Sequence, residues 1–525
     1  MPSSRIAAPV AGLVVALSTF SSEAQLRVAA WNISNYSGGR VADIQTSVYG
    51  IFEGRTLNPD VLICQEFLSA TAVVSFANAL NTAPGSPGDW VGATFIDGPD
   101  TDSAFFYRSS RVTFLGQTVI AVGSSSSSNQ PRHTIRYDFR PVGYSSTQAT
   151  IGAYSVHMKA GSASTDQSRR LVEAQRIRDN AEGINTNGPG SALPAGYRFL
   201  VGGDFNIQTS SQAAYQELIG SQANNSGRFF DPIATPGSWN NNGAFRIVHT
   251  QDPIGAGGMD DRHDQILLSA TLIDGVGLTY QGNPAIPYST TTWNDPNHSY
   301  RAWGNDGTSF DTTLKVVGNT MVGPAIAQAL INCANGAGHL PVVLNLLLPA
   351  EIEANTTIDF GSVGINTMAD ATLTVTNSGE VEKWSASGIN TLNYSLAASA
   401  GFSAPGGSFS EDAGGGANFH TITMDTSTPG LKSGTIVITS DAPDQPTLFV
   451  TLLGEVTDSR CPADFNQDGE SDVLDFLDFL DAFGQCESQP APCTPSGFDA
   501  DFNGDTLVDV LDFLDFLDAF GRGCE

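Results

Sequence analysis

The spacing of hydrophobic and polar positions divides the chain into regions. From residue 26 onward, short apolar runs that carry a polar group at or near one end alternate with helical stretches. The apolar runs predict buried strands at 26–32, 60–66, 149–158, 199–207, 264–269 and 339–344. Apolar residues at helical spacing among Arg and Glu predict an amphipathic helix over 165–182. We therefore expect an α/β domain over residues 26–348.

Beyond residue 349 the pattern changes to Thr, Ser and Gly with alternating apolar residues. Short strands separated by turns are predicted at 358–363, 371–377, 419–424 and 434–439. About seven such strands in this interval indicate an all-β sandwich over residues 350–456. The region resembles bacterial immunoglobulin-like (Ig-like) modules. It carries no catalytic constellation, so we expect a spacer or adhesion module.

The last region, residues 460–525, contains an internal repeat with an offset of 37 residues. Oxygen-bearing side chains recur at positions 1, 3, 5, 9 and 12 of each copy, which is calcium-loop spacing followed by a helix. The expected Ca²⁺ ligands are Asp464, Asn466, Asp468, Asp472, Asp475, Asp501, Asn503, Asp505, Asp509 and Asp512. We expect a small α-helical calcium-loop domain.

The repeat resembles a dockerin type I pair, with two departures. Position 6, where a sharp turn favours glycine, is Gly469 in the first loop and Thr506 in the second, so the second site should be weaker. Positions 10 and 11 are apolar, whereas cellulosomal recognition faces carry hydroxyl residues. The resemblance implies a cohesin-like partner. Because of the two departures, attachment to another cell-surface receptor is an equal alternative.

Residues 1–24 have the pattern of a secretory signal peptide. Arg5 precedes an apolar run over 7–20, and small residues precede the expected start of the mature chain near Gln25. The run is shorter than the roughly 20 residues that a membrane span needs, and no later segment is long and apolar enough. We expect a secreted or cell-surface-attached protein without a transmembrane segment.

If the protein is exported, its cysteines can form disulfides. Cys461, Cys486, Cys493 and Cys524 cluster near the C-terminus, and the sequence does not choose among their three pairings. Cys64 lies in an apolar run and is expected to be a buried free thiol.

The net charge of −30 is concentrated in the C-terminal third. Residues 460–525 carry 16 acidic and 2 basic side chains, and residues 350–459 carry 13 and 2. This excess argues against nucleic-acid binding by these two regions. The first region is close to neutral, which permits a polyanionic substrate without requiring one.

Polar groups at the strand ends of the first region are candidates for a site. Asp204 and Asn206 follow an apolar strand and are two residues apart, so an extended chain places both on one face. Asn32 and Glu66 end two other predicted strands, and His157 lies near the end of a third. Core packing gives no reason for this repetition, whereas strand ends that converge on a site do.

The motifs of this region, taken in order, resemble the endonuclease/exonuclease/phosphatase (DNase I-like) superfamily. They are Trp31-Asn32, Gln65-Glu66, His157-Met-Lys-Ala-Gly161, Gly203-Asp-Phe-Asn206, Arg262-His-Asp264 and His339-Leu-Pro-Val342. The resemblance implies a four-layered α/β sandwich and a Mg²⁺- or Mn²⁺-dependent hydrolase of phosphoric esters. A stretch over 300–307 would be a loop above the cleft.

The resemblance also implies a role for each position. Glu66 would be the main Mg²⁺ or Mn²⁺ ligand, with Asn32 beside it. Asp204 and Asn206 would orient the attacking water and a phosphate oxygen. His339, held by Asp264, would act as general base or phosphate contact. His157 would contact the scissile phosphate or protonate the leaving oxygen, and Lys159 and Arg108 are further candidate phosphate contacts.

One position departs from the family pattern. Gly338 stands where the family has an Asp that helps to hold the metal. We expect an exported phosphodiester hydrolase, with nucleic acid as the leading substrate. The alternatives are a phosphoesterase acting on phospholipid head groups or inositol phosphates, and a surface or adhesion protein that is weakly active or inactive.

Overall fold

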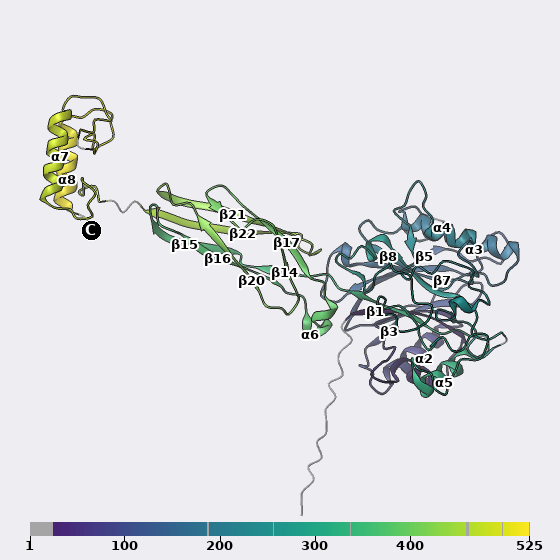
Figure 1. The fold of residues 1–525 in the computed structure, drawn as a ribbon. Coiled ribbons are helices and arrows are strands. Elements are labelled where there is room, and N and C mark those ends of the chain that lie inside the picture. Colours follow the sequence, from purple (N-terminus) through teal and green to yellow (C-terminus); the bar gives the residue numbers. More distant parts are fainter. Residues whose placement is uncertain are drawn as a thin grey trace, which may run out of the picture.

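The computed structural model describes residues 25–185, 188–255, 257–336, 338–457, 461–495 and 497–523 (Figure 1). The predicted signal peptide, residues 1–24, lies outside this range. Among the described residues, no helix has the length and apolar character needed to cross a membrane.

Two sheets form the centre of the first region. The first has the order β11-β13-β1-β2-β4-β3 with β12 paired to β13, and the second has the order β5-β6-β7-β8-β10-β9. The first sheet consists of β1 (Leu26–Tyr36), β2 (Val61–Phe67), β3 (Trp90–Gly92), β4 (Asp102–Arg108), β11 (Thr279–Tyr280), β12 (Arg301–Ala302) and β13 (Val342–Leu347). The second consists of β5 (Val112–Ala121), β6 (Thr134–Pro141), β7 (Ile151–His157), β8 (Arg198–Asp204), β9 (Phe229–Phe230) and β10 (Asp264–Ser269).

Helices cover the outer faces of both sheets. α1 (Val41–Tyr49), α2 (Ala70–Asn81) and α5 (Gly323–Ala334) pack on the first sheet, and α3 (Ser164–Ala181) and α4 (Ala213–Ile219) on the second. β1 explains the layering, because Val28 and Ala30 belong to the core between the sheets while Ala29 and Trp31 belong to the core under the helices. Short 3-10 turns lie at Thr147–Ala149, Gly243–Phe245 and Ala270–Leu272. The result is the predicted four-layered α/β sandwich.

The predicted strands are present, with two boundary shifts that have physical causes. β8 ends at Asp204 rather than 207, because Asn206 has a positive φ of 49° that an extended strand does not allow. β13 begins at Val342 rather than 339, and the residue before it is Pro341, which has no N–H to donate to a neighbouring strand. The two shifts place Asn206 and His339 outside the strands, Asn206 just after β8 and His339 just before β13.

The second region is a sandwich of a four-stranded and a five-stranded sheet around one apolar core. Its strands are β14 (Ile352–Ala354), β15 (Thr357–Gly364), β16 (Asp370–Asn377), β17 (Leu392–Ala398), β18 (Phe402–Ser403), β19 (Ser408–Glu411), β20 (Asn418–Met424), β21 (Gly430–Ser440) and β22 (Thr447–Thr457). The sequence predicted about seven strands, and the additional ones include the very short β14 and β18.

The β-sandwich is packed tightly against the α/β region. Helix α6 (Val381–Trp384) places the Trp384 ring in the core between the two α/β sheets, with the Arg111 guanidinium 3.9 Å from its centroid. The Asp444 carboxylate accepts the backbone N–H groups of Ser145 and Ser146, each at 2.7 Å. The two regions therefore share a hydrophobic core and charged hydrogen bonds.

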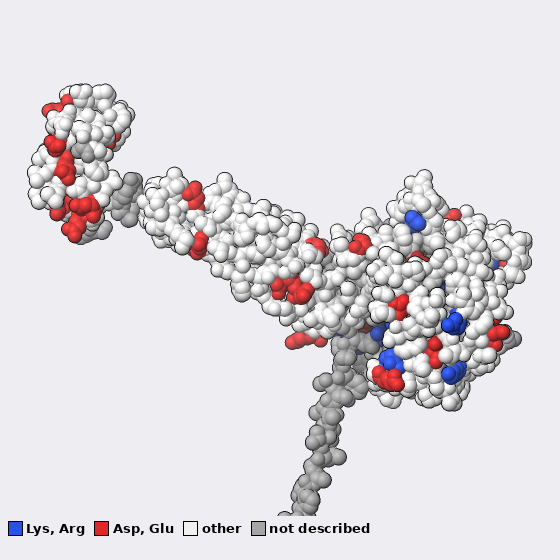
Figure 2. Space-filling model, in the orientation of Figure 1, with Lys and Arg blue, Asp and Glu red and all other residues white. Residues whose placement is uncertain are grey.

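The tail has two helices, α7 (Val473–Cys486) and α8 (Val510–Arg522), packed through phenylalanine rings. Figure 2 shows acidic side chains over this part, as the charge count predicted. Cys486 and Cys493 form a disulfide, Cys461 is also disulfide-bonded, and Cys524 lies outside the described residues. Cys64 is the buried free thiol that was predicted, and burial raises the pKa of its thiol.

Candidate active site

The candidate residues of the α/β region meet at one edge of the sandwich. Strand pairing places Asn32 beside Gln65, His157 beside Asp204, and Asp204 opposite Asp264. His339 lies in the segment just before β13, which pairs with β1. The sequence-predicted residues come together in one network: Asn32, Glu66, His157, Asp204, Asn206, Asp264 and His339.

Asp204 is the centre of this network. Its Oδ2 accepts the side-chain amides of Asn206 at 3.0 Å and Asn32 at 3.2 Å, and its Oδ1 accepts the Asn206 backbone N–H at 2.9 Å. The Nε2 atoms of His157 and His339 lie 3.5 and 3.6 Å from Oδ2. Burial alone would raise the pKa of Asp204, but His339, His157 and His263 lower it to about 2. Asp204 is therefore an ionised, buried carboxylate.

Backbone strain positions the neighbouring Glu66. The pairing of β2 with β4 shifts register between Cys64 and Phe67, and Glu66 has a φ of 64°. Positive φ is costly for a residue with a Cβ and persists where the surrounding structure enforces it. The Glu66 carboxylate accepts Asn32 Nδ2 at 3.0 Å on Oε1 and the Asn35 N–H at 2.8 Å on Oε2. The shift thus turns a carboxylate that is still 17% exposed toward the site.

His339 and Asp264 form a buried pair. Nδ1 of His339 lies 2.7 Å from Oδ2 of Asp264, and both side chains are at most 5% exposed. Burial alone would lower the pKa of His339, but the carboxylates of Asp264 and Asp204 outweigh it and raise the pKa to about 10. Burial raises the pKa of Asp264, and His339 opposes that rise. The pair directs a protonated Nε2 toward Asp204.

The pKa of His157 is shifted in the opposite direction from that of His339. Burial and the nearby Arg132 lower its pKa to about 4, against the attraction of Asp204 and Glu66. Its Nε2 lies 3.7 Å from Glu66 Oε1, and its Nδ1 has no hydrogen-bond partner among the described residues. The site therefore holds one neutral and one protonated imidazole, both within 3.6 Å of the same carboxylate oxygen.

The donor set fits a hard cation that keeps most of its water. Glu66 is the one partly exposed carboxylate of the network, and Mg²⁺ binds through one or two carboxylates plus waters. No group of three or more His, Cys, Asp or Glu side chains within the described ranges is arranged as a metal cage. Asn32 turns its Oδ1 toward the Ser34 N–H and its amide nitrogen toward Glu66 and Asp204. In this orientation Asn32 orders the carboxylates of Glu66 and Asp204, and its role as a metal ligand beside Glu66 stays a prediction.

The structure explains why position 338 is glycine. A Cβ at Gly338 would lie 2.2 Å from the Ala334 carbonyl oxygen and 2.4 Å from the Ala334 Cα. Real Cβ atoms do not approach backbone atoms so closely, so an Asp here would require the end of α5 to move. The carboxylate that the family pattern has at this position does not fit this chain.

Several residues near the site were missed by the sequence patterns. Arg132 donates to the backbone oxygen of His157 at 3.1 Å, and buried Arg170 donates to the oxygens of Lys159 and Gly161. His263 is buried, both of its ring nitrogens lack a hydrogen-bond partner among the described residues, and it is one of the three histidines that lower the pKa of Asp204. The signal that could have pointed to His263 is its place inside the motif Arg262-His-Asp264.

Two other candidate cations are engaged in ion pairs. Arg108 lies 3.5 Å from Asp60 and 3.3 Å from Asp89, and Asp60 lies next to the beginning of β2, away from Glu66. Lys159 lies 3.5 Å from Asp166 and is partly exposed. Arg108 is therefore a structural residue, and Lys159 lies on the loop that follows His157.

The loops of the tail have the expected order of oxygen-bearing residues. In the first loop, Asp464 accepts the N–H groups of Asp468 and Gly469, and Asp475 accepts those of Asn466 and Asp472. The second loop repeats these contacts through Asp501 and Asp512. Thr506 has a φ of 78° where Gly469 has 95°, a conformation that is strained for a β-branched residue.

No family model and no curated protein matches the chain. Among solved structures, it is similar to an endonuclease/exonuclease/phosphatase from Beutenbergia cavernae, at 12% identity over 82% of this chain and 100% of that chain, with a TM-score of 0.31. Sphingomyelinase C from Streptomyces griseocarneus has 12% identity over 61% and 99%, with a TM-score of 0.32. ANGEL2, a 2',3'-cyclic phosphatase, has 12% identity over 62% and 96%, with a TM-score of 0.33. With TM-scores below 0.5, these likenesses establish neither the family nor the activity of this chain.

Proposed function

We propose that the α/β region is a hydrolase of phosphodiesters, with extracellular nucleic acid as its leading substrate. The observation that carries this proposal is the surroundings of Asp204 Oδ2. Two imidazole nitrogens lie within 3.6 Å of it and two amides donate to it, beside the partly exposed Glu66. Such a group suits an anionic tetrahedral centre, because cations and donors neutralise the charge that develops there.

Each side chain has a task that its protonation state allows. Protonated His339 contacts a phosphoryl oxygen through Nε2, because Asp264 holds its Nδ1. Ionised Asp204 orients the attacking water and accepts its hydrogen bond. Asn206 and Asn32 fix Asp204, and Asn206 is itself anchored to the Met158 carbonyl oxygen at 3.1 Å. His157, whose Nε2 lies 3.5 Å from Asp204 Oδ2, contacts the phosphate or the leaving oxygen.

The proposed cofactor is Mg²⁺ or Mn²⁺, held by Glu66. When bound, such an ion polarises a phosphoryl oxygen as a Lewis acid. The raised pKa of His339 favours the role of cationic phosphate contact over that of general base, because a base must be neutral to accept a proton.

Nucleic acid is preferred as substrate for two reasons. The α/β region is close to neutral while the rest of the chain is acidic, so a polyanion meets least repulsion at this region. Export would also expose the enzyme to extracellular nucleic acid. Phospholipid head groups and inositol phosphates are the second candidate substrates, since the network recognises a phosphate and not a base. A weakly active or inactive adhesion protein is the alternative outcome.

The test uses the full mature chain, because Trp384 of the β-sandwich completes the core of the α/β region. The protein is incubated with Mg²⁺ or Mn²⁺ and with DNA, RNA, sphingomyelin or a generic phosphodiester. Turnover should fall in Glu66→Ala and in His339→Ala. Turnover that survives both substitutions would refute the site assignment, and no turnover of any substrate would favour the adhesion protein.

We further propose that the tail binds Ca²⁺ and attaches the protein to a cohesin-like or other cell-surface receptor. Val473, Leu474, Val510 and Leu511, at positions 10 and 11 of the two loops, are each 51–62% exposed. Exposed apolar residues at equivalent places on two helices suit a docking surface. Ca²⁺ should raise the melting temperature of the tail, and a tail whose unfolding ignores chelator would contradict the loop assignment.

A further inference from the structure

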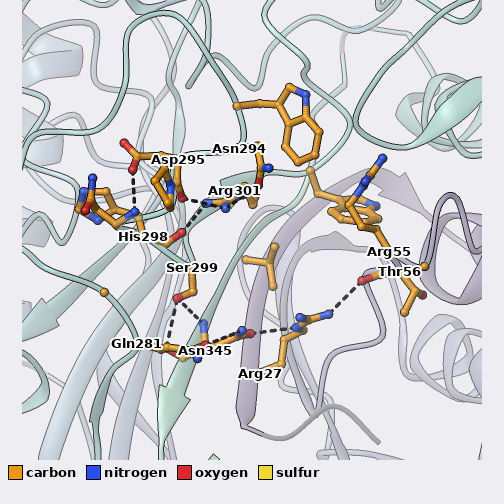
Figure 3. Close-up of a pocket in the computed structure, with 17 residues that line it drawn as sticks. Arg27, Arg55, Thr56, Gln281, Asn294, Asp295, His298, Ser299, Arg301 and Asn345 are labelled. Atoms are coloured by element: carbon orange, nitrogen blue, oxygen red, sulfur yellow. Dashed lines mark hydrogen bonds between the residues drawn. The ribbon is translucent and has the colours of Figure 1, made fainter. Parts of the chain in front are cut away.

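A pocket lies in the α/β region, away from the network around Asp204. It is a cavity of about 560 Å³ on the outer face of the first sheet, beyond the part that the helices cover (Figure 3). Its floor includes Arg27 and Asn345, and Arg27 precedes Asn32 by five residues on β1. At about 3.3 Å per residue the two sites are roughly 17 Å apart along the strand.

The stretch 300–307, expected to lie over the catalytic cleft, contributes to this pocket instead. Arg301 and Trp303 line it, and Arg301 Nη1 donates to the backbone oxygens of His298 and Tyr300. Figure 3 shows Arg301 and Asn294 facing Arg27 and Asn345 across the cavity. These bonds fix the wall of the pocket without an added ligand.

The charge of the lining is positive. Arg27, Arg55 and Arg301 line the pocket together with one carboxylate, Asp295. Asp295 accepts the backbone N–H groups of Ser289 and Asn297, which lower the pKa of its carboxyl against the effect of burial. Arg301 has no carboxylate partner among the described residues, and Arg55 pairs with Glu53, which is 65% exposed and screened by solvent.

Two of the lining residues carry a donor that has no acceptor among the described residues. Trp303 lines the pocket and is 5% exposed, and its Nε1 has no hydrogen-bond partner among the described residues. Gln281 uses its Oε1 to accept Asn345 Nδ2, and no described residue accepts from its own amide nitrogen. A buried indole N–H is normally paired, so the unpaired Trp303 Nε1 favours an acceptor-rich ligand at this lining.

An aromatic side chain forms part of the wall. The Arg55 guanidinium lies 5.0 Å from the Trp293 ring centroid and 5.5 Å from that of Phe52. This arrangement holds the cation in place at the mouth of the pocket and leaves the Trp293 ring in the lining. A ring and a fixed guanidinium suit a ligand that joins a phosphate to a sugar or nucleoside.

We propose that this pocket binds a small organic phosphate, of the size of a sugar phosphate or nucleoside monophosphate. The phosphate accepts hydrogen bonds from Arg55 and Trp303 Nε1, and the sugar lies against Trp293 and the amide of Gln281. The cavity volume is within the range of small-ligand sites. Binding here does not depend on hydrolysis at Asp204, so the two proposals fail or succeed separately.

The experiment is calorimetric titration of the full mature chain with ribose 5-phosphate, adenosine monophosphate, inorganic phosphate and ribose. All titrations are repeated in His339→Ala, so that hydrolysis does not contribute heat. Arg55→Gln removes a charge, and Trp303→Phe removes one donor but keeps a ring. Arg228→Gln is the matched control, because Arg228 also lies over a ring, 4.7 Å from the Phe230 centroid, and donates to a backbone oxygen outside the pocket.

We expect saturable binding of at least one organic phosphate, weakened about tenfold or more by Arg55→Gln and severalfold by Trp303→Phe. Arg228→Gln should bind like the wild type, and ribose and inorganic phosphate should bind more weakly. A sugar phosphate that binds as tightly as the nucleotide makes the base dispensable and supports the phosphate-and-sugar assignment. Ribose binding as tightly as its phosphate, equal binding in Arg55→Gln, or no saturable binding would overturn the proposal.

Discussion

The most informative perturbation of the site is Asp264→Asn. The substitution keeps an oxygen that can accept from His339 Nδ1 and removes the charge that lies 2.7 Å away. His339 would keep its place in the site while losing one of the two carboxylates that hold its proton. The variant therefore separates the electrostatic role of Asp264 from its role in packing.

The magnitude follows from the geometry. An opposite charge in contact contributes about 1–3 pKa units to a histidine. With a folded-state pKa of about 10 in the wild type, His339 should titrate between about 7 and 9 in Asp264→Asn. This shift corresponds to about 1.4–4 kcal/mol of differential stabilisation of the imidazolium.

The assay is the NMR titration of the His339 Cε1–H signal in the full mature chain, with chelator present so that no metal ion competes. Asp261→Asn is the control, since Asp261 lies 3.7 Å from His263 and forms no side-chain hydrogen bond or ion pair with His339 in the described structure. The reasoning is refuted if wild-type His339 titrates at or below its ordinary 6.5. It is equally refuted if Asp264→Asn leaves the pKa unchanged.

The same pair predicts how stability depends on pH. The folded-state pKa of His339 is raised above 6.5, so protonation of His339 stabilises the fold fully below about pH 6.5. That contribution is lost as the pH rises from 6.5 through about 10. Urea unfolding of the wild type should therefore show falling stability across this window, and His339→Asn should flatten the slope. An identical slope in both proteins would contradict the assignment.

Three further predictions concern other parts of the chain. Gly338→Asp should destabilise the α/β region by about 1–3 kcal/mol in chemical denaturation, because its Cβ meets the backbone of Ala334, whereas Gly406→Ala, in open space, should change little. Trp384→Ala should cost about 3–5 kcal/mol and lower the unfolding temperature of the α/β region as well as the sandwich, and a loss confined to the sandwich would contradict the shared core. Asp475→Ala should lower the Ca²⁺ affinity of the tail at least tenfold by calorimetry, and an unchanged affinity would exclude the first loop as a site.

The sequence patterns predicted the layered α/β fold and the grouping of the candidate residues for the same physical reason. Strands β1, β2 and β8 are mostly apolar before Asn32, Glu66 and Asp204, so these polar residues stand out in the sequence. Strands that pair in register then bring these ends together, which needs no knowledge of side-chain contacts. A polar residue in a loop does not stand out in this way, because its neighbours are also polar. Arg132 lies in a serine-rich loop, and only the tertiary fold brings it to His157.

The sequence patterns also did not predict that the β-sandwich packs against the α/β region. Trp384 occupies a short helix between strands of its own region, and nothing in that local sequence shows that its ring enters the core of another region. The protonation states of His157 and His339 depend in the same way on distant burial and on neighbours from different strands. Contacts of this kind connect residues far apart in the chain and have no local periodicity.

The central claim is that the network around Asp204 hydrolyses phosphodiesters, and turnover of bis(4-nitrophenyl) phosphate with Mg²⁺ tests it most directly. His339→Asn is compared with His420→Asn, which removes another buried histidine, hydrogen-bonded to Tyr394 at 2.7 Å in the β-sandwich. The account predicts a loss of kcat of about 10²- to 10⁴-fold in His339→Asn and wild-type turnover in His420→Asn. Equal turnover in the two variants would contradict it.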